Sequence, residues 1–276
     1  MDNMHLTLNR HPKLENATLL VALTGWMDGG DVSTGTVKQL MSGRKGVREI
    51  GRIDPDDFYI YNFPGNMEIA SLFRPRVKYD TGVVTEFEMP SNIFLCDEAA
   101  NLVFFAGKEP NLRWQSFADC IFSVVKHVGI SRIVFVGSFG GSVPHTREPR
   151  LYGSVSHPRL RALLKQYSLR PSEYEGPASF STLLLSEAKR HEVEMVSLVA
   201  EIPGYLQGTN PRSIEAVARR LASIINQPID LDSLREASNE WESQVTAAVE
   251  KDEELAGTIR KLEDEYDDEL IQSEGA

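Results

Sequence analysis

The sequence predicts a mixed α/β fold, in which helices flank a mainly parallel or mixed sheet and a helical extension follows at the C-terminal end. Short apolar runs alternate with amphipathic segments, which is typical of a parallel sheet covered by helices on both faces. Three of the apolar runs end in glycine-rich or polar loops. The last segment of the chain is acidic, and its apolar residues recur at a helical spacing.

The first buried strand is expected at residues 18–24, and a glycine-rich loop follows at residues 25–31. The next helix is expected to have Ser33 as its N-cap. A loop between a strand and a helix N-terminus can bind an anion, because the first helical amides point outward. However, Asp28 and Asp31 disfavour phosphate, and neither the P-loop nor the dinucleotide motif is matched. We therefore expect a tight turn in which both aspartates cap the helix.

Four short segments are expected to form an antiparallel or mixed flank of the sheet. They are residues 48–53, 83–89, 93–96 and 102–106. The loop at residues 107–114 then places Arg113 at the carboxyl end of a strand. The helix after this loop has an apolar face and ends at Gly129, a typical C-terminal cap. Its predicted core residues are Phe117, Ile121, Val124, Val125 and Val128.

The central segment of the chain reads R-I-V-F-V-G-S-F-G-G-S-V-P-H-T-R at residues 132–147. Residues 133–136 are β-branched or aromatic, as expected of a strand buried on both faces. We expect Gly137, Gly140 and Gly141 to break this strand into a loop whose backbone can approach a ligand closely. The polar side chains of this loop are Ser138, His145, Thr146 and Arg147. Ligands bind at this edge of open α/β sheets.

The second half of the chain continues the alternation of helices and strands. Amphipathic helices are expected at residues 157–167 and 180–191, and a buried strand at 194–200. Asn210 is expected to cap the next helix, with proline at the first helical position. In a right-handed α/β arrangement the loops after residues 24, 136 and 200 would gather at one edge of the sheet.

The composition is that of a globular protein. The chain has 276 residues, of which 41% are hydrophobic and 25% charged. No apolar run approaches the ~20 residues of a membrane helix, and the N-terminus has no apolar signal core. Cys96 and Cys120 lie in apolar contexts without metal-ligand spacing, so we expect buried free thiols and a cytoplasmic protein.

The charge of the chain is concentrated in its tail. Residues 230–276 carry 16 acidic and 4 basic side chains, whereas residues 1–229 are close to neutral. We therefore divide the chain into an α/β core domain at 1–229 and an acidic amphipathic helical extension at 230–276. Apolar residues of the extension follow an imperfect heptad spacing, which suits either packing on its own domain or contact between subunits. No clustered basic surface indicates nucleic-acid binding.

Several separated motifs resemble the proteasome-assembly-chaperone-2 family, especially its bacterial, actinobacterial-type members. They are L-V-A-L-T-G-W-x-D-x-G-D near the start, G-S-F-G-G-S-V-P-H-T-R in the middle, and G-P-A-S-F-S-T-L-L-L and E-I-P-G-Y-L-Q-G-T-N-P later. The resemblance covers about residues 17–225. It implies a core similar to the nucleoside phosphorylase/hydrolase-like fold and self-association, with a trimer favoured. It also implies a possible proteasome-related protein partner, because some relatives bind proteasome subunits.

One enzymatic alternative is nucleophilic catalysis. Ser138 would be activated by His145, with Glu201 or Asp28 as the acid. The order G-S-x-G-G departs from the G-x-S-x-G of a hydrolase elbow, however, and the histidine lies on the same loop as the serine.

A second enzymatic alternative is phosphorylase-like chemistry on a nucleoside-like or other small anionic ligand. Arg147 or Arg113 would bind phosphate as a bidentate donor, and Glu201 would bind a ribose hydroxyl. Trp26, Phe139 or Tyr205 would stack on a base. Fold analogy favours this alternative, but a fold does not determine a function.

The interpretation that we favour is a packing and assembly surface, because large amphipathic residues such as Trp26 and Tyr205 are enriched at interfaces. We predict a non-enzymatic binding or assembly protein without a cofactor. No metal is predicted either, because no histidine is paired with another His or Cys at ligand spacing. The candidate ligand-binding residues are Trp26, Asp28, Asp31, Arg113, Gly140, Gly141, Arg147 and Tyr205, and the catalytic candidates are Ser138, His145 and Glu201.

Overall fold

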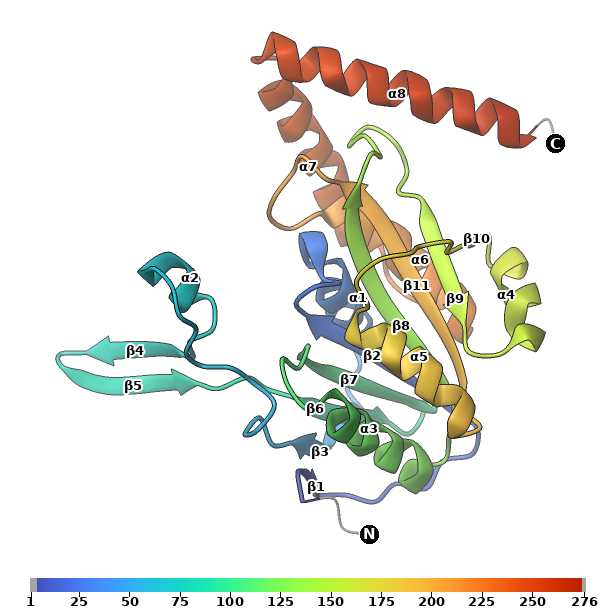
Figure 1. The fold of residues 1–276 in the computed structure, drawn as a ribbon. Coiled ribbons are helices and arrows are strands. Elements are labelled where there is room, and N and C mark those ends of the chain that lie inside the picture. The colour runs from blue at the N-terminus through green and yellow to red at the C-terminus, as the bar shows by residue number, and fades with distance from the viewer. Residues whose placement is uncertain (1–3, 275–276) are drawn as a thin grey trace.

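A nine-stranded mixed sheet organises the computed structural model, which describes residues 4–274 (Figure 1). The strand order is β1-β3-β6-β7-β2-β8-β11-β9-β10. The strands of this sheet are β1 (Leu6–Leu8), β2 (Ala17–Thr24), β3 (Arg48–Ile53), β6 (Ile93–Asp97), β7 (Leu102–Lys108), β8 (Ile130–Gly141), β9 (Leu151–Val155), β10 (Arg170–Pro171) and β11 (Glu194–Pro203). The helices are η1 (Gly29–Asp31), α1 (Val32–Met41), α2 (Met67–Ser71), α3 (Trp114–Val128), η2 (Pro158–Leu160), α4 (Arg161–Gln166), α5 (Phe180–Arg190), α6 (Pro211–Ile225), α7 (Asp232–Val249) and α8 (Glu253–Glu274).

The four central strands β7, β2, β8 and β11 are parallel, whereas β1, β3 and β6 form an antiparallel flank, in which the sequence predicts β3 and β6 but not β1. The sequence also assigns β7 to the flank, but β7 pairs in parallel with β2 and antiparallel with β6, and so joins the flank to the parallel centre. Apolar residues on the two faces of the sheet form separate cores. Along β2, Leu19 and Val21 face α3 and α5, and Leu20 faces the core shared by α1 and α6, as alternation along a strand requires. The predicted fold class is confirmed.

Residues 62–90, which we call the arm, project from the flank of the sheet (Figure 1). The arm contains α2 and a separate ribbon of β4 (Arg76–Asp80) and β5 (Val83–Glu88). The expectation that residues 83–89 join the flank of the main sheet is wrong. Thr81 and Gly82 both have positive φ, 49° and 81°, so they form the tight type I′ turn that pairs β5 with β4 instead.

The central strand is longer than its sequence predicts. β8 continues through Gly137, Gly140 and Gly141 and pairs with β11 as far as Pro203, so the expectation that these glycines break the strand is wrong. They lie in the strand because side chains are excluded there. A Cβ at Gly141 would lie 2.4 Å from Oε1 of Glu201.

The helix caps are confirmed in part. Asn210 accepts a hydrogen bond from the amide of Ser213 at the start of α6 (2.9 Å), and Gly129 ends α3 with a φ of 93°. Ser33, however, is not the N-cap of α1. Its buried hydroxyl donates to the carbonyl of Val136 (2.5 Å) and so links α1 to β8.

The C-terminal helices pack on their own chain. α7 lies against α6, and α8 crosses the carboxyl end of the sheet (Figure 1). Of the predicted heptad positions, Ile259 and Tyr266 are buried, and Leu234 packs against the core. The boundary between residues 229 and 230 stays a prediction.

None of the helices within residues 4–274 combines the length and the apolar content that crossing a membrane requires.

Candidate functional site at the carboxyl ends of the central strands

The loops after β2, β8 and β11 meet at one edge of the sheet, as the sequence predicts. The amide of Ser138 donates to the carbonyl of Met27 (2.9 Å), and the amide of Asn210 donates to the carbonyl of Gly30 (2.8 Å). Parallel pairing of β2, β8 and β11 brings these segments together. This edge, built from three strand ends, is the candidate site.

Glu201 is the most heavily bonded side chain of this edge. It is 5% exposed, and its Oε1 accepts hydrogen bonds from the amides of Ser142 (2.8 Å) and Val143 (3.1 Å). Its Oε2 lies 3.3 Å from a guanidinium nitrogen of Arg150 and accepts from the hydroxyl of Tyr152 (3.4 Å). A buried carboxylate with this many donors is stabilised as a charged group, and it fixes the turn after β8.

Ser138 holds two strand ends together. The residue is fully buried, and its hydroxyl donates to the carbonyl of Gly29 (2.6 Å). The hydroxyl therefore points into the backbone of the loop after β2. No hydrogen bond within residues 4–274 joins Ser138 to His145, and the proposed nucleophile and base do not form the bonded chain that a triad needs.

His145 bonds to two different elements. Its backbone amide and its Nδ1 both lie 2.8 Å from the hydroxyl of Tyr205, and its Nε2 lies 3.1 Å from the hydroxyl of Thr246 on α7. Because the hydroxyl of Tyr205 already accepts a hydrogen bond from the amide of His145, we assign the hydroxyl as a donor to Nδ1 of the imidazole. The imidazole then carries its own proton on Nε2. Burial lowers the pKa of His145, which favours this neutral ring. The histidine therefore links the site to α7.

Arg147 forms a bidentate ion pair with α8. Its Nε and Nη2 lie 2.8 and 2.7 Å from the two carboxylate oxygens of Asp267, and Glu263 lies 3.7 Å away. The bidentate hydrogen bonds raise the pKa of Arg147 and lower that of Asp267. The guanidinium face that would hold a phosphate is therefore occupied by a carboxylate of the same chain.

Arg150 makes a second link to α8. Its Nη2 lies 2.7 Å from Oε2 of Glu269, which also pairs with Arg170. The guanidinium stacks over the ring of Tyr266, 4.6 Å from its centroid, and the tyrosine hydroxyl donates to the carbonyl of Glu148 (3.0 Å). The acidic face of α8 thus covers the basic side of the candidate site.

In the loop after β2, the expectation that both aspartates cap α1 is confirmed for Asp28 and wrong for Asp31. The two carboxylate oxygens of Asp28 accept from the amide (3.0 Å) and the hydroxyl (2.8 Å) of Thr34, and so cap α1. Burial raises the pKa of Asp28. Asp31 occupies the N-cap position with a φ of 54°, but its side chain makes no capping bond and accepts from Thr209 instead (2.5 Å).

Trp26 and Arg113 do not join the buried network. The indole of Trp26 is 65% exposed, and the tryptophan amide donates to Glu109 (3.0 Å). Arg113 forms an exposed ion pair with Asp57 (3.1 Å). No hydrogen bond or ion pair within residues 4–274 links either residue to Arg147 or Glu201. The predicted cluster therefore divides into a buried network and an exposed rim.

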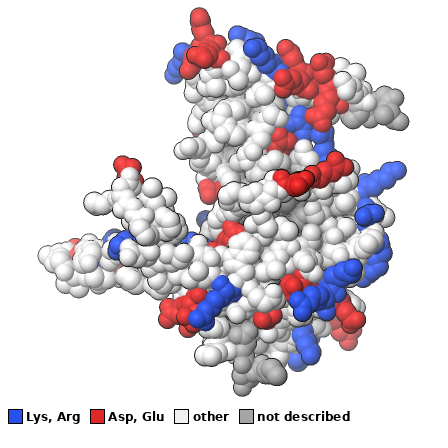
Figure 2. Space-filling model, in the orientation of Figure 1, with Lys and Arg blue, Asp and Glu red and all other residues white. Residues whose placement is uncertain are grey.

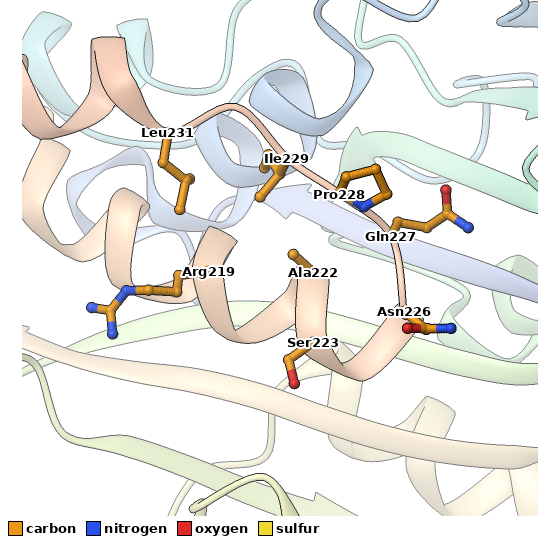
Figure 3. Close-up of a pocket in the computed structure, with 8 residues that line it drawn as sticks. All are labelled: Arg219, Ala222, Ser223, Asn226, Gln227, Pro228, Ile229 and Leu231. Atoms are coloured by element: carbon orange, nitrogen blue, oxygen red, sulfur yellow. The ribbon is translucent and has the colours of Figure 1, made fainter.

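Two surface hollows lie beside α6 rather than among the candidate residues. One, of about 400 Å³, is lined by the end of α6 and the linker to α7 (Figure 3). The other, of about 480 Å³, lies between α6 and α7 and is lined largely by paired charges such as Arg212 and Glu242. Neither is lined by Ser138, His145 or Glu201.

The sequence-based site omits the residues that close it. Arg150 was missed although it follows Arg147 by three positions. The sequence shows that residues 263–269 are acidic, but it does not show that they pair with Arg147 and Arg150. Glu109 was missed as the carboxylate that accepts from the amides of both Trp26 and Phe180 (2.8 Å). Within residues 4–274 no group of three or more His, Cys, Asp and Glu side chains is placed to hold a metal ion.

Known proteins of solved structure have the same architecture as this chain. Three solved structures share the fold with TM-scores of 0.73–0.83. A Mycobacterium tuberculosis protein of unknown function has 23% identity and a TM-score of 0.83, and the alignment covers 100% of this chain and 92% of that one. A proteasome-assembly chaperone homologue of the same organism has 26% identity and a TM-score of 0.76, with 88% and 99% covered. A PAC2 family protein of Streptomyces avermitilis has 27% identity and a TM-score of 0.73, with 87% and 98% covered.

No curated protein matches the sequence significantly. The PAC2 family model, in contrast, matches residues 22–249. This range includes the three strand ends of the candidate site and all of α7. Because the match spans most of the sequence, the chain belongs to the PAC2 family.

Proposed function

We propose that this protein is a non-enzymatic, self-associating binding or assembly protein of the cytoplasm, and that its partner is a proteasome-related protein. The identity of the partner class is supported by the proteasome-assembly chaperone homologue of M. tuberculosis, which aligns over 88% of this chain with 26% identity. Membership of the PAC2 family supports the same role.

One observation carries the preference for binding over catalysis. The polar side chains at the carboxyl edge bond to one another and to the C-terminal helices. Glu201 is saturated by backbone amides and Arg150, His145 by Tyr205 and Thr246, and Arg147 by Asp267. Catalytic groups need to face a substrate, whereas satisfied buried groups stabilise a shape.

The proposal is tested by native mass spectrometry of the purified chain mixed with proteasome α subunits, β subunits or the assembled particle from the same cell. We expect a stoichiometric complex with at least one of these components. A control mixture with an unrelated α/β protein should give none. Absence of a complex with all three components would contradict the proteasome-related partner.

The alternative is a phosphorylase- or hydrolase-like enzyme that acts on a nucleoside-like or other small anionic ligand at the same edge. It requires α8 to move away from Arg147. Calorimetric titration with a nucleoside in phosphate buffer distinguishes the two. Heat of binding that is lost on Arg147→Ala supports the enzyme, and no binding to the wild-type chain supports the assembly protein.

A further inference from the structure

The ribbon of the arm is amphipathic. Cross-strand partners lie on the same face of a ribbon, and the register pairs Val77 with Phe87 and Tyr79 with Val84. These four side chains are 46–62% exposed. The same register pairs Arg76 with Glu88 and Lys78 with Glu86, and the last pair is an ion pair of 3.1 Å. One face of the ribbon is therefore apolar and the other carries balanced charges.

The exposed apolar surface of the arm is about as large as one side of a protein–protein interface. The three exposed aromatic residues of the arm, Phe63, Tyr79 and Phe87, are 43%, 62% and 62% exposed, which amounts to roughly 300 Å² of ring surface. Exposed aliphatic residues of the arm add to this area: Val77 and Val84 lie on the same face of the ribbon, and Met67, Ile69 and Leu72 lie in and after α2. The total approaches the ~800 Å² that each partner contributes to a stable interface. On the side that Figure 2 shows, most of the surface of the arm is uncharged.

The arm also lacks internal support. A two-stranded ribbon is marginally stable in water, and every residue of β4 and β5 is exposed. α2 has five residues, none of which is buried. The arm projects away from the sheet that would otherwise cover it (Figure 1). Burial against another molecule would supply the missing support.

The same chain offers a second exposed apolar surface. Away from the arm and the two ends of the chain, the large apolar side chains that are exposed are Trp26, Leu112, Phe139 and Tyr174, at 39–68%. We call Trp26 and Phe139 the edge patch. Trp26 and Phe139 lie on adjacent segments, because the carbonyl of Met27 accepts from the amide of Ser138. Glu109 bonds the amides of Trp26 and Phe180 and so joins this segment to the start of α5, which follows Tyr174.

We propose that the arm of one copy packs its apolar face on the edge patch of a second copy. This inference rests on the self-association in the proposed function and identifies its surfaces. The contact is heterologous, since two different surfaces meet, and such contacts form a ring when the rotation between copies closes. Charge does not oppose it: the arm carries four acidic and three basic residues, and the strong negative charge of the chain lies in residues 230–276.

The test uses two variants of the full chain. Tyr79→Ser with Phe87→Ser impairs the arm, and Trp26→Ser with Phe139→Ser impairs the edge patch. Lys78→Ser with Glu86→Ser changes the charged face of the same ribbon and is the matched control. Light scattering with size-exclusion chromatography gives the mass of each, relative to 30.9 kDa for one chain. Circular dichroism confirms that each variant is folded.

We expect the wild type and the control to be oligomeric and both impaired variants to be monomeric. An equimolar mixture of the two variants should form a heterodimer, because the intact arm of one can bind the intact edge patch of the other. If the edge variant stays oligomeric while the arm variant is monomeric, the arms bind each other and the proposal is wrong. If neither variant changes the mass, the proposal is also wrong, whereas self-association stands. A monomeric wild type contradicts both.

Discussion

The arm and the carboxyl edge of the sheet differ in which side chains are left without partners in the chain. At the edge, Glu201 and His145 are buried and Arg147 is half-buried, and each is bonded within the chain. On the arm, apolar groups such as Tyr79 and Phe87 remain in water with no cover. On the side that Figure 2 shows, charged side chains gather at the C-terminal helices and at the opposite end of the molecule, whereas most of the surface of the arm is uncharged.

This contrast indicates where binding free energy is still available. A satisfied polar network gains little from a new partner, because any new hydrogen bond replaces an existing one. Exposed apolar surface gains about 25 cal/mol for each Å² that it loses to a partner. The arm is therefore the surface that gains most from association, and the edge network is the part of the molecule most sensitive to substitution.

The largest expected effect is at Glu201. Glu201→Leu removes the buried carboxylate partner of Arg150, which keeps only Glu269, and leaves two amides unpaired, so we expect the free energy of unfolding to fall by about 3–5 kcal/mol. Chemical denaturation measures this loss. Glu201→Gln keeps an acceptor for the amides and should lose less. Equal stability of the leucine variant and the wild type would show that the network is dispensable.

A pair of glycines compares the two regions directly. Gly141→Ala would place a Cβ 2.4 Å from the carboxylate of Glu201, which should cost about 1–3 kcal/mol. Gly82→Ala, at the tip of the arm, meets no atom within 4 Å and strains only a positive φ. We expect a lower melting temperature for the first variant and an unchanged global transition for the second. The reverse order would contradict the contrast.

The contact of α8 should weaken in acid. The hydrogen bonds from Arg147 lower the pKa of Asp267 below 3.8. Burial raises the pKa of Glu269, but Arg170 and Arg150 lower it by more, to below 4.5. Carboxylates with lowered pKa values stabilise the fold above their ordinary pKa, and this stabilisation is lost as the pH falls through the lowered values.

Thermal unfolding from about pH 7 to about pH 3 tests this linkage. Asp267→Asn with Glu269→Gln should be less stable than the wild type at neutral pH, and the difference should disappear in acid. A difference that does not depend on pH would mean that the ion pairs contribute nothing to stability.

The smallest effect is expected on the arm. Tyr79→Ser with Phe87→Ser removes two exposed rings, so each substitution should change the free energy of unfolding by no more than about 0.5 kcal/mol. Denaturation at a concentration where the chain is monomeric measures this. A large loss would show that the arm packs on its own core.

Much of the fold follows from local sequence patterns. The strands at residues 18–24 and 194–200 and the helix that ends at Gly129 are formed by apolar periodicity and caps, which depend on nearby residues. β5 was assigned to the wrong sheet, because the turn at Thr81 and Gly82 was not recognised. β8 was ended too early, because Gly141 is explained by Glu201, about sixty residues away in the chain.

The sequence predicts where the candidate site lies, but it does not predict that α8 covers the site and pairs with its arginines. Strand ends that converge are a property of α/β topology, so the meeting of the loops after β2, β8 and β11 follows from the alternation. The pairing of Arg147 with Asp267 and of Arg150 with Glu269 joins residues more than one hundred positions apart. Composition shows that the tail is acidic, but no local pattern shows which arginines it contacts.

Hydrogen exchange of α8 tests most directly whether the chain closes its own polar edge. Asp267→Asn with Glu269→Gln removes the contacts to Arg147 and Arg150, and Asp264→Asn with Asp268→Asn removes the same charge from the exposed face of the helix. We predict slow exchange of α8 amides in the wild type and the control, and fast exchange in the first variant, with β8 and β11 unchanged. Equally fast exchange of α8 in all three proteins would show that the edge is open, and would contradict the account.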